Sequence, residues 1–122
     1  MSSEASVAAR VRLEASRLGI RLWRNNVGAG KLTNGTFIRF GLANESTQMN
    51  THIKSADLIG IRPILIGPEH VGLTIGQFVS RECKHPGWRY AGDAHEIAQK
   101  RWADLINILG GNASFVTGEG SF

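Results

Sequence analysis

The sequence lacks the features that would place the protein outside a reducing compartment. Its single cysteine, Cys83, cannot form an internal disulfide bond, which fits a reducing environment. The chain begins Met-Ser-Ser-Glu, with neither the basic segment nor the apolar segment of a signal peptide. No apolar run approaches the length of a transmembrane helix. We therefore expect a cytoplasmic protein that has no membrane partner.

Two common binding motifs are also missing from the sequence. The four histidines do not combine with cysteine in the spacing of a zinc site. Gly30-Lys31 suggests a phosphate-binding loop, but this motif requires a glycine where the chain has Asn25, and a Ser or Thr where leucine follows the lysine. Residues 25–35 are better interpreted as a flexible hairpin tip with its turn at Asn34-Gly35.

The composition is that of an ordinary globular chain of one domain, residues 1–122. Hydrophobic residues make up 42% and charged residues 20%, and 15 glycines indicate tight turns and at least one mobile loop. The net charge of +4 favours a polyanionic partner without establishing one, because a solvated basic surface explains the same charge equally well.

Two segments have the pattern of amphipathic helices. Over residues 4–18, apolar side chains recur on one face, and Gly19 suits the residue after the helix end. Over residues 94–109, Asp93 and Glu96 form a capping-box pattern, and Gly110 supplies the stop. The buried face of this second helix is expected to include Trp102.

The remaining apolar segments read as strands, so the fold class is α/β. A polar, irregular loop is expected over residues 43–56, and Pro63 ends or bends the strand that begins at Asp57. The order is a helix, several strands, a second helix and a last strand; it contains the succession α-β-β-β-α-β and predicts a central mixed β-sheet flanked by helices. The predicted strands cover residues 20–24, 37–42, 57–66, 75–84 and 113–117.

The predicted strand over residues 75–84 contains most of the candidate catalytic residues. Side chains alternate along a strand, so Glu82 and Lys84 point to one face and Cys83 points to the other, buried, face. If this strand pairs with the one that Asp57 begins, two carboxylates and one ammonium converge, and they would suit a hard divalent cation with an activated water. The bare triplet is also compatible with an exposed ion pair at a strand end.

The chain as a whole resembles the PD-(D/E)XK nuclease superfamily, and more specifically its small phage-type VRR-NUC (virus-type replication-repair nuclease) members. The segments that carry the resemblance are Ser55-Ala-Asp57-Leu-Ile-Gly60, Arg81-Glu82-Cys-Lys84, Gln99-Lys-Arg-Trp102, Trp23-Arg-Asn-Asn-Val-Gly28 and Gly110-Gly-Asn-Ala-Ser-Phe-Val116. One departure is the approach to Asp57, which is Ser55-Ala56 where the family usually has Gly-x-Pro.

The resemblance implies a restriction-endonuclease-like core and a set of roles. Asp57 and Glu82 would bind Mg²⁺ or Mn²⁺ together with the Cys83 backbone carbonyl, and Glu4 would add a further carboxylate. Lys84 would orient or deprotonate the attacking water, or stabilise the transition-state anion. Gln99 would hydrogen-bond the water or the phosphate.

Other side chains are candidates for contacts with DNA or with a partner chain. Trp88 lies in a predicted loop beside Arg89 and Tyr90, and it suits either base stacking or contact with a partner chain. The candidate phosphate contacts are Arg24, Lys31, Arg39, Lys54 and Lys100.

The predicted function is that of a metal-dependent DNA endonuclease selective for branched DNA such as four-way junctions. Symmetric cutting of two strands calls for a homodimer, and a phage-encoded enzyme would act in the cytosol of its bacterial host. Two alternatives remain: a non-catalytic DNA-binding module on the same fold, and an interaction protein whose acidic and basic cluster is structural.

Overall fold

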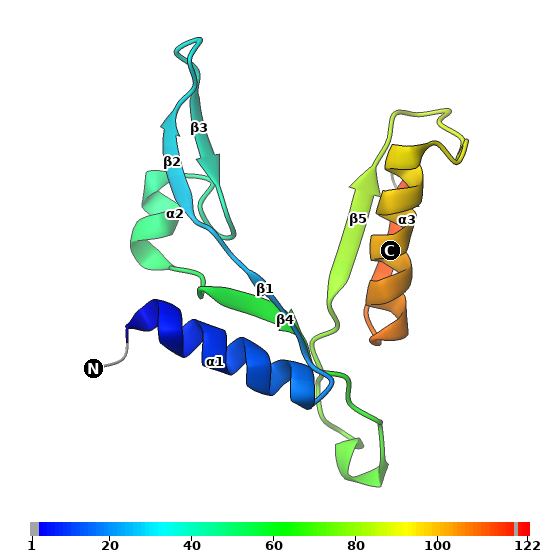
Figure 1. The fold of residues 1–122 in the computed structure, drawn as a ribbon. Helices are drawn as coiled ribbons and strands as arrows, with labels where there is room; N and C mark the ends of the chain where they lie inside the picture. Colours follow the sequence, from blue (N-terminus) through cyan, green and yellow to red (C-terminus); the bar gives the residue numbers. More distant parts are fainter. Residues whose placement is uncertain (1–2, 119) are drawn as a thin grey trace. The chain divides into compact units, whose positions relative to one another are not determined.

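The computed structural model describes residues 3–118 and 120–122, and these divide into two compact units. One unit extends to Gly60 and the other begins at Ile61 (Figure 1). Each unit is a mixture of helix and strand, so the α/β class is confirmed at this level. The single domain over 1–122 remains a prediction.

The first unit opens with helix α1 (Glu4–Arg17), as predicted from its apolar periodicity. The Ser3 hydroxyl caps the helix by accepting a hydrogen bond from the Ser6 amide at 3.1 Å. Glu4 lies in the first turn, where the helix dipole favours a carboxylate. Gly19, with φ of 74°, turns the chain into strand β1 (Arg21–Arg24), against which α1 lies.

A β-hairpin follows, and its paired strands include residues that the sequence pattern assigns to a flexible tip. Strands β2 (Gly28–Lys31) and β3 (Phe37–Phe40) are antiparallel, and Gly28 is opposite Phe40. The turn at Asn34-Gly35 is confirmed, since Gly35 has φ of 86° and its amide donates to the Leu32 carbonyl. The prediction of a flexible tip over 25–35 was wrong for residues 28–31, because backbone pairing outweighs their low strand propensity.

The polar segment after the hairpin contains a short helix, α2 (Thr47–His52), where we expected an irregular loop. The Ser46 hydroxyl caps it by accepting from the Met49 amide at 3.0 Å. The buried Asn44 side chain anchors the segment to the hairpin, because it donates to the carbonyls of Gly28 (2.7 Å) and Phe40 (3.0 Å).

Strand β4 (Leu58–Ile61) pairs with β1, and it ends before Pro63 as expected. The strands run in opposite directions: the Asn25 amide donates to the Asp57 carbonyl at one end, and Gly60 lies against Arg21 at the other. A Cβ atom on Gly60 would lie only 1.8 Å from the Arg21 carbonyl oxygen. Only glycine fits this close approach between the two backbones.

The substitution Gly60→Ala is therefore expected to destabilise the protein by about 1–3 kcal/mol through overpacking. Urea denaturation followed by circular dichroism measures the free energy of unfolding. Gly30→Ala is the matched control, because Gly30 is also a strand residue but no atom lies within 4 Å of its added Cβ. Equal stability of the two variants would contradict this close approach.

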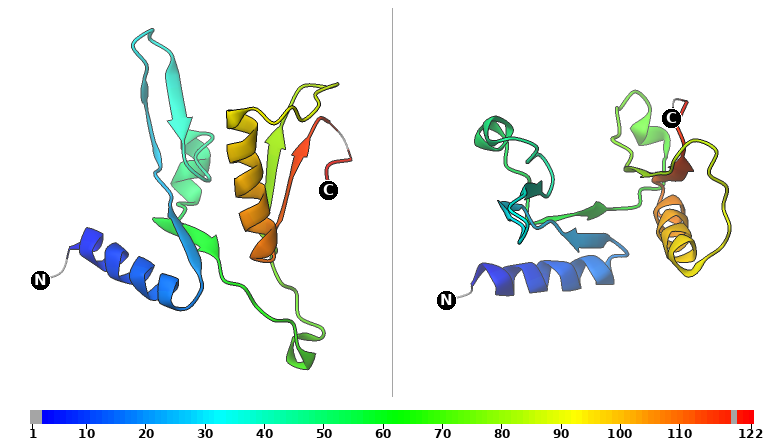
Figure 2. Two further views of the ribbon diagram at one scale, coloured as in Figure 1. Left: turned by 45° about the vertical axis from the view of Figure 1, so that its right-hand side comes forward. Right: turned by 90° about the horizontal axis from the view of Figure 1, so that it is seen from above.

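The second unit is built around a strand–helix–strand connection. Strand β5 (Val79–Cys83) is parallel to β6 (Asn112–Val116), with Val79 opposite Asn112, and helix α3 (Ala94–Ile108) connects them. A short 3-10 turn, η1 (Pro68–His70), precedes β5. Figure 2 shows α3 running along the strand pair. The fully buried Ile106 of α3 forms the centre of this packing.

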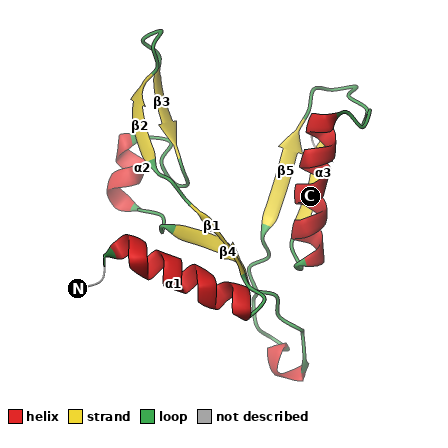
Figure 3. Cartoon of the chain, viewed as in Figure 1, coloured by secondary structure: helices red, strands yellow, loops and turns green. Residues whose placement is uncertain are grey.

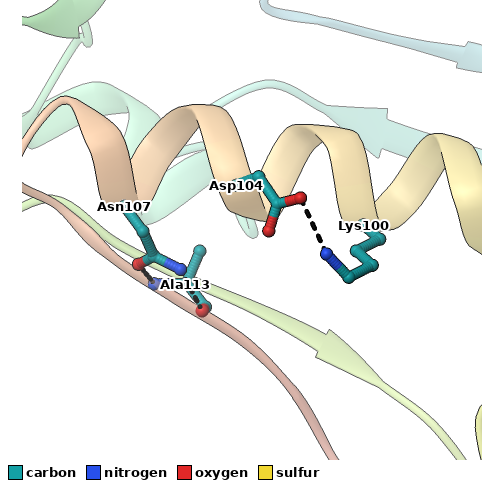
Figure 4. A network of polar contacts seen from close by, with 4 residues as sticks. All are labelled: Lys100, Asp104, Asn107 and Ala113. Carbon is teal, nitrogen blue, oxygen red and sulfur yellow. Dashed lines mark hydrogen bonds and ion pairs between the residues drawn. The ribbon is translucent and has the colours of Figure 1, made fainter.

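Helix α3 has the predicted start, because Asp93 and Glu96 form both bonds of the capping box. Its later turns are fixed to β6 by one side chain (Figure 4): the Asn107 amide donates to the Ala113 carbonyl at 3.0 Å and accepts from the Ala113 amide at 2.8 Å. Such a paired amide contact stabilises the register between helix and strand.

Two burial predictions were wrong in this unit. Trp102 is 39% exposed instead of buried, and its indole N–H donates to the Ser80 hydroxyl at 2.9 Å. Cys83 is exposed because α3 covers only the opposite face of β5. On the Cys83 face, Arg81 donates to the Ser121 carbonyl and lies 4.8 Å from the centroid of the Phe122 ring.

The strands of the described residues form three two-stranded sheets, two of them antiparallel and one parallel, with three α-helices. Figure 3 distinguishes helices, strands and loops by colour. The single central sheet of a restriction-endonuclease-like core remains a prediction. No helix in the described part of the chain is long and apolar enough to span a bilayer.

Candidate functional site

The α3 face of β5 brings together three of the four predicted catalytic side chains. The Lys84 ammonium donates to Gln99 Oε1 at 2.9 Å, and Gln99 Nε2 donates to Glu82 Oε1. Glu82 and Lys84 therefore share a face of the strand, as their spacing indicates, and Gln99 reaches both from α3. All three side chains are half-buried.

The amide of Gln99 can serve both neighbours in only one orientation. Its oxygen accepts from the cation, and its nitrogen donates to the carboxylate. If the amide were reversed, its N–H groups would face the ammonium and its oxygen would face the carboxylate, and both contacts would be repulsive. Gln99 thus fixes the positions of an acid and an amine at the same time.

His95 joins this cluster and was missed as a site residue. Its Nε2 lies 3.1 Å from Gln99 Nε2, one helical turn away on α3. Because the Gln99 amide has two protons, it can donate to both Glu82 and an unprotonated His95 Nε2. The i, i+4 spacing of His95 and Gln99 is the sequence signal that could have identified the pair.

The cluster borders an open pocket of about 440 Å³ within the second unit. The residues that line it are Ser80, Arg81, Glu82, His95, Ala98, Gln99 and Trp102.

Asp57 lies in the first unit, exposed on the bend directly before β4, so the strand begins one residue later than predicted. Asn25 shapes the turn before it: its side-chain amide donates to Ser55 Oγ at 2.8 Å and to the Ala56 carbonyl at 2.9 Å. Ser55 in turn donates to the Leu42 carbonyl at 2.7 Å. Side-chain hydrogen bonds therefore hold the approach to Asp57.

The other predicted metal ligands are placed as follows. Glu4 is exposed on the first turn of α1, and Cys83 is the last residue of β5, opposite Val116. Among the residues that the structure describes, no three His, Cys, Asp or Glu side chains gather as a metal site. Asp57 and Glu82 belong to different units, so their convergence remains a prediction.

The five predicted phosphate contacts differ in whether their side chains already form hydrogen bonds within the protein. Arg24 and Lys31 are exposed strand residues of the first unit. Arg39 donates to Asn44 Oδ1 at 3.3 Å and to Thr47 Oγ1, which gives it a structural role beside the hairpin. Lys54 donates to the Asn50 carbonyl at 3.0 Å, at the end of α2.

Lys100 forms an ion pair with Asp104 on the exposed surface of α3, with Nζ 2.8 Å from Oδ2 (Figure 4). The hydrogen bond that Lys100 donates to Asp104, together with the negative charge of Asp104, raises the pKa of Lys100 above its usual value. A DNA phosphate that binds it would have to compete with Asp104.

No model of a protein family matches the chain, and neither the curated proteins nor the solved structures contain a significant match.

Proposed function

We propose that the protein is a metal-dependent DNA endonuclease of the VRR-NUC type, with a restriction-endonuclease-like core, that hydrolyses phosphodiester bonds in branched DNA. The observation that carries the proposal is the Glu82–Gln99–Lys84 cluster at the edge of an open pocket. A carboxylate, an amide and an ammonium on one strand–helix face are the groups that the family motif requires. A surface ion pair would need no bridging amide.

The donor chemistry of the predicted ligands fits magnesium or manganese. Both cations prefer carboxylate and carbonyl oxygens, and magnesium keeps several waters, so few protein ligands suffice. Gln99 contacts Oε1 of Glu82. Glu82, Asp57 and the Cys83 carbonyl are the groups that would hold the cation. A bound ion would lower the pKa of a water and offset negative charge on the phosphate.

The chain's own residues would do the positioning. Lys84 donates to Gln99, which lines the pocket, and its ammonium would orient the attacking water or stabilise the anionic transition state. Gln99 keeps Lys84 and Glu82 in a fixed relation, and this matters because a small misplacement of reacting groups lowers the rate steeply. Exposed cations such as Arg24 and Lys31 would bind the DNA backbone, and a homodimer would supply two sites for symmetric cutting.

The test compares a labelled four-way junction with a linear duplex of the same sequence, each with Mg²⁺, with Mn²⁺ or with EDTA. We expect junction cleavage with either metal and none with EDTA. Binding without cleavage under every metal condition would support the DNA-binding module instead. Neither binding nor cleavage would leave the cluster with a structural role and would overturn the proposal.

A further inference from the structure

The most buried carboxylate of the second unit, Glu96, does more than cap its helix. Its side chain is 5% exposed, and Oε1 accepts from the amides of Ala91 and Gly92, each at 3.0 Å. Its other oxygen, Oε2, accepts the indole N–H of Trp88 at 2.8 Å. Helices α1 and α2 are capped by serine hydroxyls, so a buried carboxylate is not required for capping.

Burial of a carboxylate is costly unless hydrogen bonds satisfy it. The bonds that satisfy Glu96 come from the loop over residues 85–93, which connects β5 to α3. One consequence is that the loop is fixed to the first turn of α3. A second consequence is that the indole of Trp88 is fixed by its hydrogen bond to the Glu96 carboxylate.

Trp88 in turn forms one wall of an aromatic site around the Lys84 ammonium. Its ring stacks on Phe115 of β6, with centroids 5.0 Å apart and planes at 27°. Lys84 Nζ lies 5.6 Å from the Trp88 centroid and 5.8 Å from the Phe115 centroid. Both distances are within the range of cation–π attraction. Gln99 accepts a hydrogen bond from the same ammonium.

We propose that Trp88 and Glu96 are positioning residues for Lys84. Lysine is a point charge on a flexible four-carbon stem, so its ammonium needs external constraints to occupy one position. The Glu96 carboxylate fixes Trp88, the Trp88 and Phe115 rings attract the cation, and Gln99 fixes its direction. The catalytic consequence rests on the proposed nuclease function, whereas the positioning itself does not.

The positioning is tested by NMR of the lysine side chains in the full-length protein. The chain has only four lysines, and Lys84→Arg identifies the Lys84 resonance. Ring currents are expected to shift the Lys84 Hε protons upfield of those of Lys31, Lys54 and Lys100. Trp88→Leu should move the Lys84 resonance toward those of the other lysines, with the remaining shift due to Phe115.

Two conservative variants separate the hydrogen bond from the ring. Trp88→Phe keeps an aromatic face but removes the N–H that Glu96 accepts, and Glu96→Gln places an N–H group against the indole N–H. Both should move the Lys84 resonance part of the way. Asp104→Asn is the matched control: it makes the same carboxylate-to-amide change on the same helix, where the carboxylate pairs with Lys100, and should leave Lys84 unmoved.

The effect on catalysis is tested by measuring the kinetics of junction cleavage by the same variants. Trp88→Phe and Glu96→Gln are expected to lower kcat by roughly 10- to 100-fold through misplacement of the ammonium, with KM for DNA unchanged. The proposal would be overturned if the Lys84 resonance coincided with those of the other lysines, or if Trp88→Leu left it in place. It would also be overturned if kcat were unchanged in variants whose Lys84 resonance has moved. If the wild type shows the shift but cuts no DNA under any metal condition, the nuclease function fails while the positioning of Lys84 stands.

Discussion

Replacing Lys84 with methionine is expected to lower the rate of junction cleavage by about 10²–10⁴, the usual contribution of one well-placed acid–base group. Methionine keeps an apolar stem against Trp88 and Phe115 but removes the ammonium that contacts Gln99. The fold should therefore persist. Single-turnover kinetics with protein in excess over labelled junction measure the chemical step separately from product release.

Arg101→Met is the control for the lost positive charge, because Arg101 is an exposed residue of the same unit and lies outside the predicted site. Its cleavage rate should stay close to that of the wild type. Binding of the junction in EDTA should change little in either variant, since one charge among many contributes modestly to affinity. A Lys84→Met protein that cleaves at the wild-type rate would remove Lys84 from the mechanism.

The substitution Glu82→Gln should have an effect of similar or greater size. It replaces an anionic oxygen ligand by a neutral amide, while the new side chain still offers an oxygen to Gln99. A metal ion supplies several kcal/mol of transition-state stabilisation, so we expect the rate with Mg²⁺ to fall by roughly 10³-fold. Cleavage measured across a range of Mg²⁺ concentrations reports both the rate and the metal requirement.

Glu69→Gln is the matched control for this loss, since Glu69 lies on the η1 turn of the same unit and its side chain is 70% exposed. Its Mg²⁺ dependence should equal that of the wild type. The role of Glu82 as a metal ligand would be contradicted if Glu82→Gln kept its full rate at the same Mg²⁺ concentration.

Features determined by local chemistry could be predicted from the sequence. The ends of α1 and α3 follow from their apolar periodicity, the Asp93–Glu96 capping box and the glycines that stop them. The shared face of Glu82 and Lys84 follows from strand alternation alone. The turn at Asn34-Gly35 follows from the preference of glycine for positive φ.

Features determined by distant contacts could not be predicted. Strand β2 has a Gly-Ala-Gly sequence without a side-chain pattern, and it forms because β3 pairs with it. Alternation shows that Cys83 is on the other face from Glu82, but it does not reveal that α3 covers only the Glu82 face. The capping box identifies Glu96, whereas its bond to Trp88 depends on the path of the intervening loop.

The most direct test of the proposal that Asp57 and Glu82 bind one cation is Mn²⁺ binding followed by electron paramagnetic resonance, in the wild type, in Asp57→Asn, in Glu82→Gln and in the double variant. If both carboxylates bind one ion, each single substitution should weaken Mn²⁺ binding strongly and the second should add little, because interacting groups are not additive. A wild type that binds no Mn²⁺, or two substitutions whose effects simply add, would contradict the account.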